Sequence, residues 1–166
     1  MATKENALEA YAGESQANRK YAVFSEKAAA EGFPAVAKLF KAASEAEAVH
    51  AKRILFLLEM VEMTEENLKK SMEGETREFR TMYPAFIEEA KNERKHEAEV
   101  IFTHAMKAEE VHANLYLQAL ESIRAGGDLD ADHVYLCPVC GNIEIGDTPE
   151  RCPICGVPAR MFREIK

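Results

Sequence analysis

The first 136 residues contain no cysteine, and all four cysteines lie in the last thirty residues of the chain. The sequence also lacks any apolar run near the ~18 residues that a membrane-spanning helix needs, and its first residues lack the apolar region of a signal peptide. It has no basic run, and its net charge is −8, which argues against nucleic acids and anionic membranes as partners. We therefore expect a soluble cytoplasmic protein.

The cysteines form two Cys-x-x-Cys pairs, and in a reducing compartment this spacing indicates a metal site rather than disulfides. Their uneven distribution indicates two modules. A helical bundle of about 120 residues can bury an adequate core, whereas an appendage of about thirty residues needs a staple such as a metal. We predict a bundle over residues 1–125, a linker over 126–133 and a small cysteine-rich domain over 134–166.

The rest of the chain reads as a mainly helical fold. Four helices are expected, over about residues 4–30, 34–63, 64–92 and 95–124. Gly32 and Pro34 stop the first helix and start the second, and Gly126-Gly127 ends the last one. Pro84 is expected to kink the third helix. The two halves, helices one and two against helices three and four, form a loose internal repeat.

Two Glu-x-x-His motifs, Glu47 with His50 and Glu109 with His112, lie on the second and fourth of these helices. Residues i and i+3 project from one face of a helix, so each motif presents a carboxylate and an imidazole together. Ferritin-like di-iron bundles combine two such motifs with a glutamate from each of the two other helices. The pattern therefore predicts a ferritin-like four-helix bundle with a di-iron site.

The first and third helices supply the missing carboxylates. Glu14 lies on the first helix, opposite His50 if the turn is near residue 32, and Glu75 and Glu78 lie on the third. Any one of these glutamates alone would be read as a surface acid. Together, five carboxylates and two imidazoles in a bundle interior would be unstable without cations. Two non-haem irons supply that charge, and a mixed oxygen and nitrogen shell suits redox-active iron.

Each Cys-x-x-Cys pair is followed by a glycine, Gly141 or Gly156. A positive φ at such a glycine lets backbone N–H groups point at sulfur, and four thiolates make a closed tetrahedral site for iron or zinc. The spacing alone favours structural zinc. An iron that carries one electron could supply electrons to the di-iron bundle, whereas zinc would serve only folding, so we expect one iron. The four predicted ligands are Cys137, Cys140, Cys152 and Cys155.

These motifs together resemble the rubrerythrin family over nearly the whole chain. The matching stretches are Ala12–Ala17 with Tyr21, His50–Arg53, Gly74-Glu75 with Glu78, Met82–Pro84, Ala108–His112 and the cysteine pairs. The resemblance implies a di-iron centre and a rubredoxin-like domain with a single iron. It implies di-iron ligands Glu14, Glu47, Glu75, Glu78, Glu109 and His112, with His50 replacing Glu78 when the centre is reduced.

The resemblance also implies an activity, the reduction of hydrogen peroxide to water. Electrons would enter through the cysteine-bound iron from an external donor, a rubredoxin or a nicotinamide-dependent reductase. Tyr21 and Tyr83 match family tyrosines near the carboxylates; spacing alone fits core aromatics equally well. Two other functions stay open, a ferroxidase or oxidase that uses dioxygen and an iron-binding storage protein.

Two features depart from the family pattern. Asn142 stands where an aromatic residue commonly follows the Cys-x-x-Cys-Gly turn. The connection between the second and third helices is also short for a family in which these helices run parallel, because the chain would have to return about 30 Å along the bundle. We therefore predict a homodimer in which the two helix pairs are swapped between subunits, with the cysteine iron near a di-iron centre across the dimer. An antiparallel hairpin within one chain is the alternative.

Overall fold

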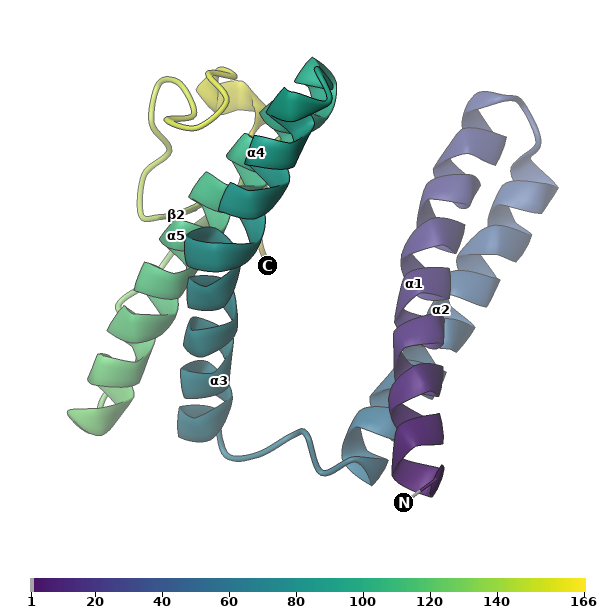
Figure 1. Cartoon of the computed structure of the whole chain (residues 1–166), viewed down its shortest axis with the longest axis horizontal. Helices are drawn as coiled ribbons and strands as arrows, with labels where there is room; N and C mark the ends of the chain where they lie inside the picture. The colour runs from purple at the N-terminus through teal and green to yellow at the C-terminus, as the bar shows by residue number, and fades with distance from the viewer. Residues whose placement is uncertain (1) are drawn as a thin grey trace. The chain divides into compact units, whose positions relative to one another are not determined.

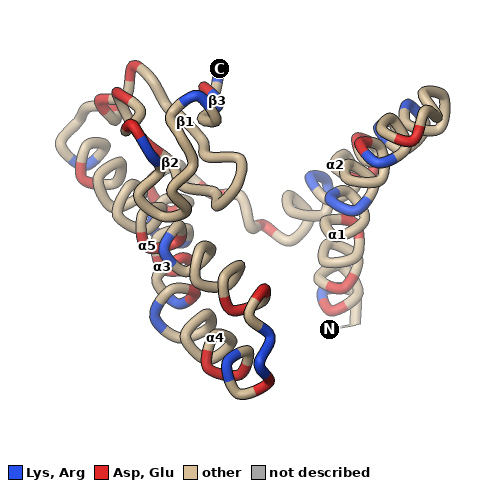
Figure 2. Tube along the Cα trace, turned by 90° about the horizontal axis from the view of Figure 1, so that it is seen from above, with Lys and Arg blue, Asp and Glu red and all other residues tan. Residues whose placement is uncertain are grey.

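The computed structural model describes residues 2–166, and the chain is mainly helical (Figure 1). It divides into two compact units, one up to Glu62 and the other from Met63 to Lys166. Acidic and basic residues are interspersed along the helices of both units (Figure 2). Among residues 2–166, no helix combines the length and the apolar character needed to cross a bilayer.

The first unit is a hairpin of α1 (Ala2–Ala30) and α2 (Pro34–Leu57), which lie side by side (Figure 1). Gly32 takes a φ of 84° at the turn, a conformation that costs glycine little. The buried residues are small, including Ala28 and Ala51, so the two helices approach closely. The rings of Tyr21, Phe24 and Phe40 pack together with centroids 5.5–6.2 Å apart.

Helix α2 ends at Leu57, six residues before the predicted end near Met63. The backbone N–H of Glu59 donates to Phe56 O and that of Met60 to Leu55 O, which closes the last turn. Glu59 takes a φ of 54° there. This left-handed residue is the usual device that ends a helix. Since it is a glutamate and not a glycine, the sequence carried no stop signal.

The second unit begins with α3 (Thr64–Arg77), a π-helix η1 (Glu78–Met82) and α4 (Tyr83–Asn92), and then α5 (His96–Arg124). The prediction of a helix over residues 64–92 with a proline kink was therefore incomplete. The N–H of Tyr83 donates to Glu78 O, five residues earlier. This wider turn lies immediately before Pro84, whose ring would clash with the carbonyl of residue i−4 in a regular α-helix.

The two helical units form an internal repeat in which equivalent residues lie 62 positions apart in the sequence. The aromatic triad Tyr21, Phe24 and Phe40 has its counterpart in Tyr83, Phe86 and Phe102, whose centroids lie 5.8–6.3 Å apart. The motif residues keep the same separation, from Glu47 to Glu109 and from His50 to His112. Glu14 and Glu75 are only 61 apart. The second unit thus gains one residue between Glu75 and Tyr83, where the π-helix lies, as expected for an insertion into a helix.

The C-terminal segment folds into a small antiparallel sheet with strand order β2-β1-β3. The strands are β1 (Val134–Leu136), β2 (Ile143–Ile145) and β3 (Arg163–Glu164), with a 3₁₀ turn η2 (Ala159–Met161) before β3. Leu136 pairs with Ile143 and with Arg163. The β2 strand lies against α5. The cysteine loops therefore pack beside the helix that carries Glu109 and His112.

Candidate metal centres

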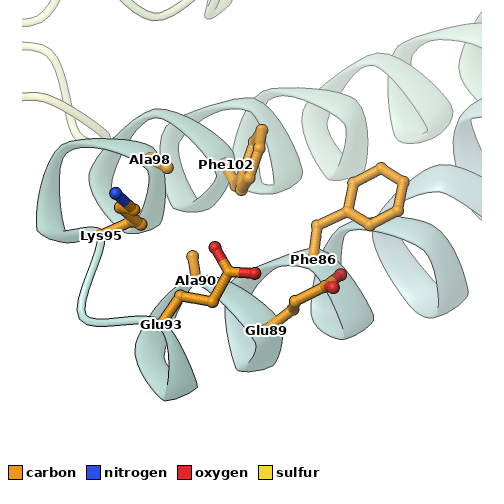
Figure 3. Close-up of a pocket in the computed structure, with 7 residues that line it drawn as sticks. All are labelled: Phe86, Glu89, Ala90, Glu93, Lys95, Ala98 and Phe102. Atoms are coloured by element: carbon orange, nitrogen blue, oxygen red, sulfur yellow. The ribbon is translucent and has the colours of Figure 1, made fainter.

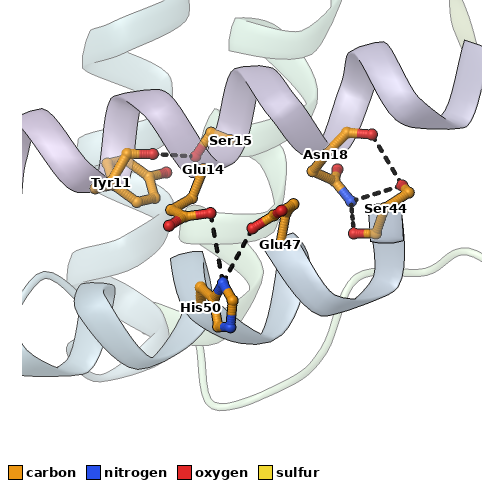
Figure 4. Close-up of polar contacts among 7 residues, drawn as sticks. All are labelled: Tyr11, Glu14, Ser15, Asn18, Ser44, Glu47 and His50. Atoms are coloured by element: carbon orange, nitrogen blue, oxygen red, sulfur yellow. Dashed lines mark hydrogen bonds and ion pairs between the residues drawn. The ribbon is translucent and has the colours of Figure 1, made fainter. Parts of the chain in front are cut away.

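Glu14, Glu47 and His50 converge in the first unit, with ligand-type atoms within 4.8 Å of one another. His50 Nδ1 lies 3.0 Å from Glu47 Oε2 and 3.5 Å from Glu14 Oε2 (Figure 4). A hydrogen bond with Glu47 raises the pKa of Glu14, and the same contact lowers the pKa of Glu47. Glu47 also raises the pKa of His50. Two carboxylates and an imidazole therefore lie close enough together for one metal cation to neutralise their charge.

A reciprocal pair of hydrogen bonds braces α1 against α2 beside this cluster. The Asn18 amide donates to Ser44 O at 2.7 Å and to Ser44 Oγ at 3.1 Å, and Ser44 Oγ donates to Asn18 O at 2.8 Å (Figure 4). Ser44 is buried. Asn18 follows Glu14 by one helical turn and Ser44 precedes Glu47 by about one turn. The brace thus fixes the register in which the two carboxylates face each other.

Glu75, Glu109 and His112 form the equivalent cluster in the second unit. His112 Nδ1 lies 2.6 Å from Glu109 Oε2, and both side chains are 18% exposed. Burial and the neighbouring Glu109 charge raise the pKa of Glu75 to about 7. The hydrogen bond with His112 lowers the pKa of Glu109 and raises that of His112. As in the first cluster, carboxylates and an imidazole are packed closely enough to share one cation.

The other nitrogen of His112 contacts the cysteine domain. His112 Nε2 lies 2.9 Å from the carbonyl oxygen of Gly141. A carbonyl only accepts hydrogen bonds, so Nε2 carries the hydrogen and Nδ1 faces the carboxylates. Hydrogen bonds from the distal nitrogen orient histidine ligands in many metal sites. The first cluster likewise presents Nδ1 of His50. Nδ1 is therefore the atom that each histidine offers to a metal.

The three remaining predicted residues, Glu78, Tyr83 and Tyr21, do not join the clusters. Glu78 begins the π-helix, and its charge contributes to the raised pKa values of Glu75 and Tyr83. Burial is the main cause of the Tyr83 shift. Tyr21 packs in the aromatic triad of the first unit. The structure therefore brings together six of the seven predicted carboxylate and imidazole ligands, three in each unit, and places Glu78 beside one group.

Tyr116 was missed by the sequence analysis. Burial raises its pKa, and the charges of Glu75 and Glu109 add to the shift, so it lies near the second cluster. It follows His112 by four residues and Glu109 by seven, a spacing that keeps all three side chains on one helix face. Helical phase could have identified it. In the first unit Ile54 occupies the corresponding position, 62 residues earlier.

The four cysteines form a third cluster, also within 4.8 Å. The Sγ atoms of Cys137 and Cys155 are 3.6 Å apart, and those of Cys140 and Cys152 are 3.5 Å apart. Burial raises the pKa of Cys140. Although burial opposes it, backbone N–H groups of Cys155 and Ile154 lower the pKa of Cys152. This crowded group of thiols fits a tetrahedral metal ion.

The glycines after each pair have the predicted positive φ, 82° at Gly141 and 77° at Gly156. Asn142, which replaces the aromatic residue of the family pattern, is almost completely buried. Its amide donates to Glu144 Oε1 at 2.7 Å, and its own oxygen has no hydrogen-bond partner among residues 2–166. At this position the loop therefore buries a polar side chain.

Comparison with known proteins assigns both modules. Residues 5–120 match the family described as rubrerythrin, and residues 135–163 match the rubrerythrin, rubredoxin-like domain. The chain belongs to the rubrerythrin family. It is 34% identical to rubrerythrin-2 of Clostridium acetobutylicum over 168 residues, covering 93% of this chain and 91% of that protein. It is 38% identical to nigerythrin of Nitratidesulfovibrio vulgaris over 174 residues, covering 96% and 85%.

A solved structure of nigerythrin in a mixed-valence state is also similar. It has 38% identity and a TM-score of 0.59, with 98% of this chain and 86% of that chain covered. In the sequence comparison with nigerythrin, 96% of 166 residues is about 159, so about 15 of the 174 aligned positions have no residue in this chain. The chain is thus shortened within the matched region.

Family membership gives the clusters their cofactors. The four cysteines are the site of a rubredoxin-type iron, so the alternative of zinc suggested by spacing is set aside. The glutamate and histidine clusters are the ligand groups of the di-iron centre. The prediction of a ferritin-like bundle with a rubredoxin-like domain is confirmed, and so is the prediction of two kinds of iron site.

Proposed function

We propose that this member of the rubrerythrin family reduces hydrogen peroxide to water in oxidative-stress defence. The overall reaction consumes one peroxide, two protons and two electrons and yields two waters. The observation that carries the proposal is the pairing of carboxylate–imidazole clusters with a four-cysteine site whose loop contacts His112. The four cysteines would hold an iron that supplies one-electron transfer, and the glutamate and histidine clusters would hold a di-iron centre that supplies two-electron reduction of peroxide.

We propose that seven side chains hold the di-iron centre: Glu14, Glu47, His50, Glu75, Glu78, Glu109 and His112. The two convergent clusters support six of them. Glu78 is included because its charge acts on Glu75 and because it lies on the π-helix, a segment whose turn can change. His50 is 53% exposed. This exposure leaves the ring room for the exchange with Glu78 that the family resemblance implies.

The tyrosines beside the carboxylates are proposed to supply protons to the departing oxygen. The pKa of Tyr83 is raised by burial, and that of Tyr116 is raised in the same way. Each phenol therefore stays protonated at neutral pH and can donate a hydrogen bond. Tyr21 is proposed to act similarly from the first unit. Replacing Tyr83 and Tyr116 by phenylalanine tests this role, because the ring remains while the proton is removed.

Electrons are proposed to reach the site along the contact between Gly141 and His112. The sequence analysis expected the cysteine iron to lie near a di-iron centre across the dimer. Within one chain, a hydrogen bond of 2.9 Å joins the cysteine loop to His112, a proposed ligand. Gly141 directly follows Cys140, so few bonds separate the thiolate from the imidazole. An external rubredoxin or nicotinamide-dependent reductase is the proposed donor, and the cytoplasm the proposed compartment.

The di-iron centre is proposed to be shared between two copies of the chain. Each unit holds only three of the convergent ligands. In a bundle with α2 parallel to α3, His50 and Glu75 lie at the same level, so the connection must run back along the bundle. It must pass the seven residues from His50 to Leu57 and the eleven from Thr64 to Glu75, or about 27 Å at 1.5 Å per residue. The seven steps from Leu57 to Thr64 span at most about 24 Å. The bonds that coil residues 58–60 shorten this reach further.

The apolar faces of the units agree with this assembly. Phe86 and Phe102 flank a hollow of about 350 Å³ between α4 and α5, with acidic and basic side chains at its rim (Figure 3). On the first unit Phe24 and Leu39 are exposed at 45% and 69%. We propose that the first unit of a second copy covers this hollow. The domain division proposed from the sequence then applies to the assembled bundle, with each half from a different subunit.

Mixing two variants distinguishes this swap from an antiparallel hairpin within one chain. Glu47→Ala disables the first unit, and Glu109→Ala disables the second. In a swapped dimer made of one copy of each variant, one di-iron site contains both altered units. The other site contains both intact units and can bind iron. Random pairing then restores about a quarter of the wild-type iron binding. A hairpin within one chain restores none. Full iron occupancy in a folded monomer at low concentration would also exclude the swap.

The peroxidase proposal is tested by mixing anaerobically reduced protein with peroxide or with dioxygen. Faster oxidation by peroxide is the expected result. Faster oxidation by dioxygen would favour the ferroxidase or oxidase alternative. Iron storage predicts many irons per chain and no dependence on the four cysteines, so metal analysis of the purified protein separates it from both enzymes.

A further inference from the structure

The four-cysteine domain contacts His112, a predicted di-iron ligand, directly. This contact indicates that the domain has a second role besides electron transfer. We propose that metal in the four-cysteine site positions His112 and thereby strengthens iron binding at the carboxylate site, independently of electron transfer. The positioning group is the carbonyl of Gly141. The inference rests on the proposed di-iron site, but it concerns metal affinity and not turnover.

His112 is held at both ring nitrogens. Nδ1 contacts Glu109 at 2.6 Å and Nε2 contacts Gly141 O at 2.9 Å. Its counterpart His50 is held at Nδ1 alone among residues 2–166, and its side chain is 53% exposed against 18% for His112. Two contacts on opposite sides of a ring fix its orientation, whereas one leaves it free to turn. The difference between the repeats is therefore the cysteine loop.

The loop is shaped around the thiols. The N–H of Gly141 donates to Cys137 O at 3.0 Å, and the N–H of Cys137 donates to Asn142 O at 2.8 Å. Cys137 has no exposed surface, and Gly141 adopts a φ of 82°. A segment of about thirty residues has too small a core to hold such a loop without its metal. Emptying the site would therefore release the Gly141 carbonyl from its place.

The loop also sits close against α5 one turn before His112. A Cβ placed on Gly141 would lie 3.9 Å from the Cβ of Ala108. Ala108 is 2% exposed. A small residue on the helix and a glycine on the loop thus allow the carbonyl to reach the imidazole. A larger side chain at position 108 would hold the loop away.

Such a contact couples the two metal sites in both directions. If metal in the cysteine site raises the affinity of the carboxylate site, iron in the carboxylate site must raise the affinity of the cysteine site by the same factor. Losing an outer-shell partner of a metal ligand weakens binding by about 10–100-fold. We expect a loss within this range when the Gly141 contact is broken.

The test compares three forms of the full chain: wild type with iron in the cysteine site, wild type with zinc there, and Cys140→Ser/Cys155→Ser. Each is titrated with Fe²⁺ without oxygen against a coloured chelator. Zinc and iron forms should bind equally, and the double variant about 10–100-fold more weakly. Equal binding by all three forms would overturn the proposal. So would a zinc form as weak as the double variant.

A second variant breaks the contact without removing a cysteine. Ala108→Leu keeps a good helix former in α5 and should leave the red colour of the thiolate iron. It should nevertheless weaken Fe²⁺ binding at the carboxylate site. Asn114→Leu adds a similar side chain at an exposed position of the same helix and should bind Fe²⁺ as wild type does. Unchanged affinity in Ala108→Leu would refute the positioning role of Gly141. Neither titration depends on peroxide reduction, so a failed peroxidase proposal would leave the result readable.

Discussion

Glu75→Gln is expected to stabilise the protein when the carboxylate site holds no metal, while abolishing iron binding there. The folded pKa of Glu75 is raised from 4.5 to about 7, chiefly by burial and then by the Glu109 charge. The folded state thus favours the neutral carboxyl. Ionising Glu75 lowers the free energy of unfolding as the pH rises from about 4.5 to 7. Glutamine is neutral at every pH and avoids this loss.

The size of the effect follows from the shift. Each pKa unit corresponds to about 1.4 kcal/mol, so a shift from 4.5 to about 7 sets an upper limit of about 3 kcal/mol. Glu75 is only half-buried, and screening by solvent reduces the figure to about 1–2 kcal/mol. The folded pKa values of His112 and His50 are also raised. These two histidines therefore also make the folded protein less stable as the pH rises. The variant should therefore flatten the pH dependence without removing it.

The assay is urea unfolding at pH 5 and pH 7.5, with zinc kept in the cysteine site so that the small domain stays folded. Glu75→Gln should be more stable than wild type at pH 7.5, and much of that advantage should vanish at pH 5. Glu88→Gln, at an exposed position of α4, is the matched control. An equal gain at both pH values, or no gain at pH 7.5, would refute the electrostatic explanation.

Three further changes have defined outcomes. Cys152→Ser, supplied with enough Fe²⁺ to fill the carboxylate site, should abolish turnover with an external donor while the pre-reduced di-iron centre still reacts with peroxide, as followed by stopped-flow absorbance; equal loss of both steps at full iron occupancy would contradict the electron-entry role. Ser44→Ala removes two hydrogen bonds of the brace and should lower the free energy of unfolding by about 1–3 kcal/mol, a loss that Ser44→Thr should partly avoid. Glu59→Gly relieves the left-handed backbone at φ 54° and should raise the melting temperature, with a gain of about 1 kcal/mol; a lower melting temperature would show that the glutamate side chain stabilises the turn.

Much of the site could be predicted because its chemistry follows helical spacing. Glu47 with His50 and Glu109 with His112 are recognisable from an i, i+3 pattern alone. Counting residues back from the expected turn near residue 32 placed Glu14 opposite His50, and the two side chains do lie together. The spacing of the two cysteine pairs likewise predicted a tetrahedral metal site. In each case a short local rule dictates where the side chain points, and no knowledge of packing between distant segments is needed.

The remainder depended on backbone geometry that residue types do not encode. Glu59 ends α2 in a conformation normally given to glycine, so the helix was predicted six residues too long. The π-helix at Glu78–Met82 is an adjustment of hydrogen bonding that leaves no periodic signature. The contact of His112 with Gly141 joins residues 29 apart, and only the folded sheet brings them together.

The π-helix has a consequence for the two metals. Had the second helical unit copied the first residue for residue, each half would have offered the same number of donors. The second unit has one residue more than the first between Glu75 and Tyr83, and this stretch carries Glu78, whereas the residue three places after Glu14 is Ala17. The second unit thus offers the carboxylate that the proposed exchange with His50 needs. Such an exchange would change the ligands of one proposed iron and not of the other, so the two irons would differ in redox behaviour.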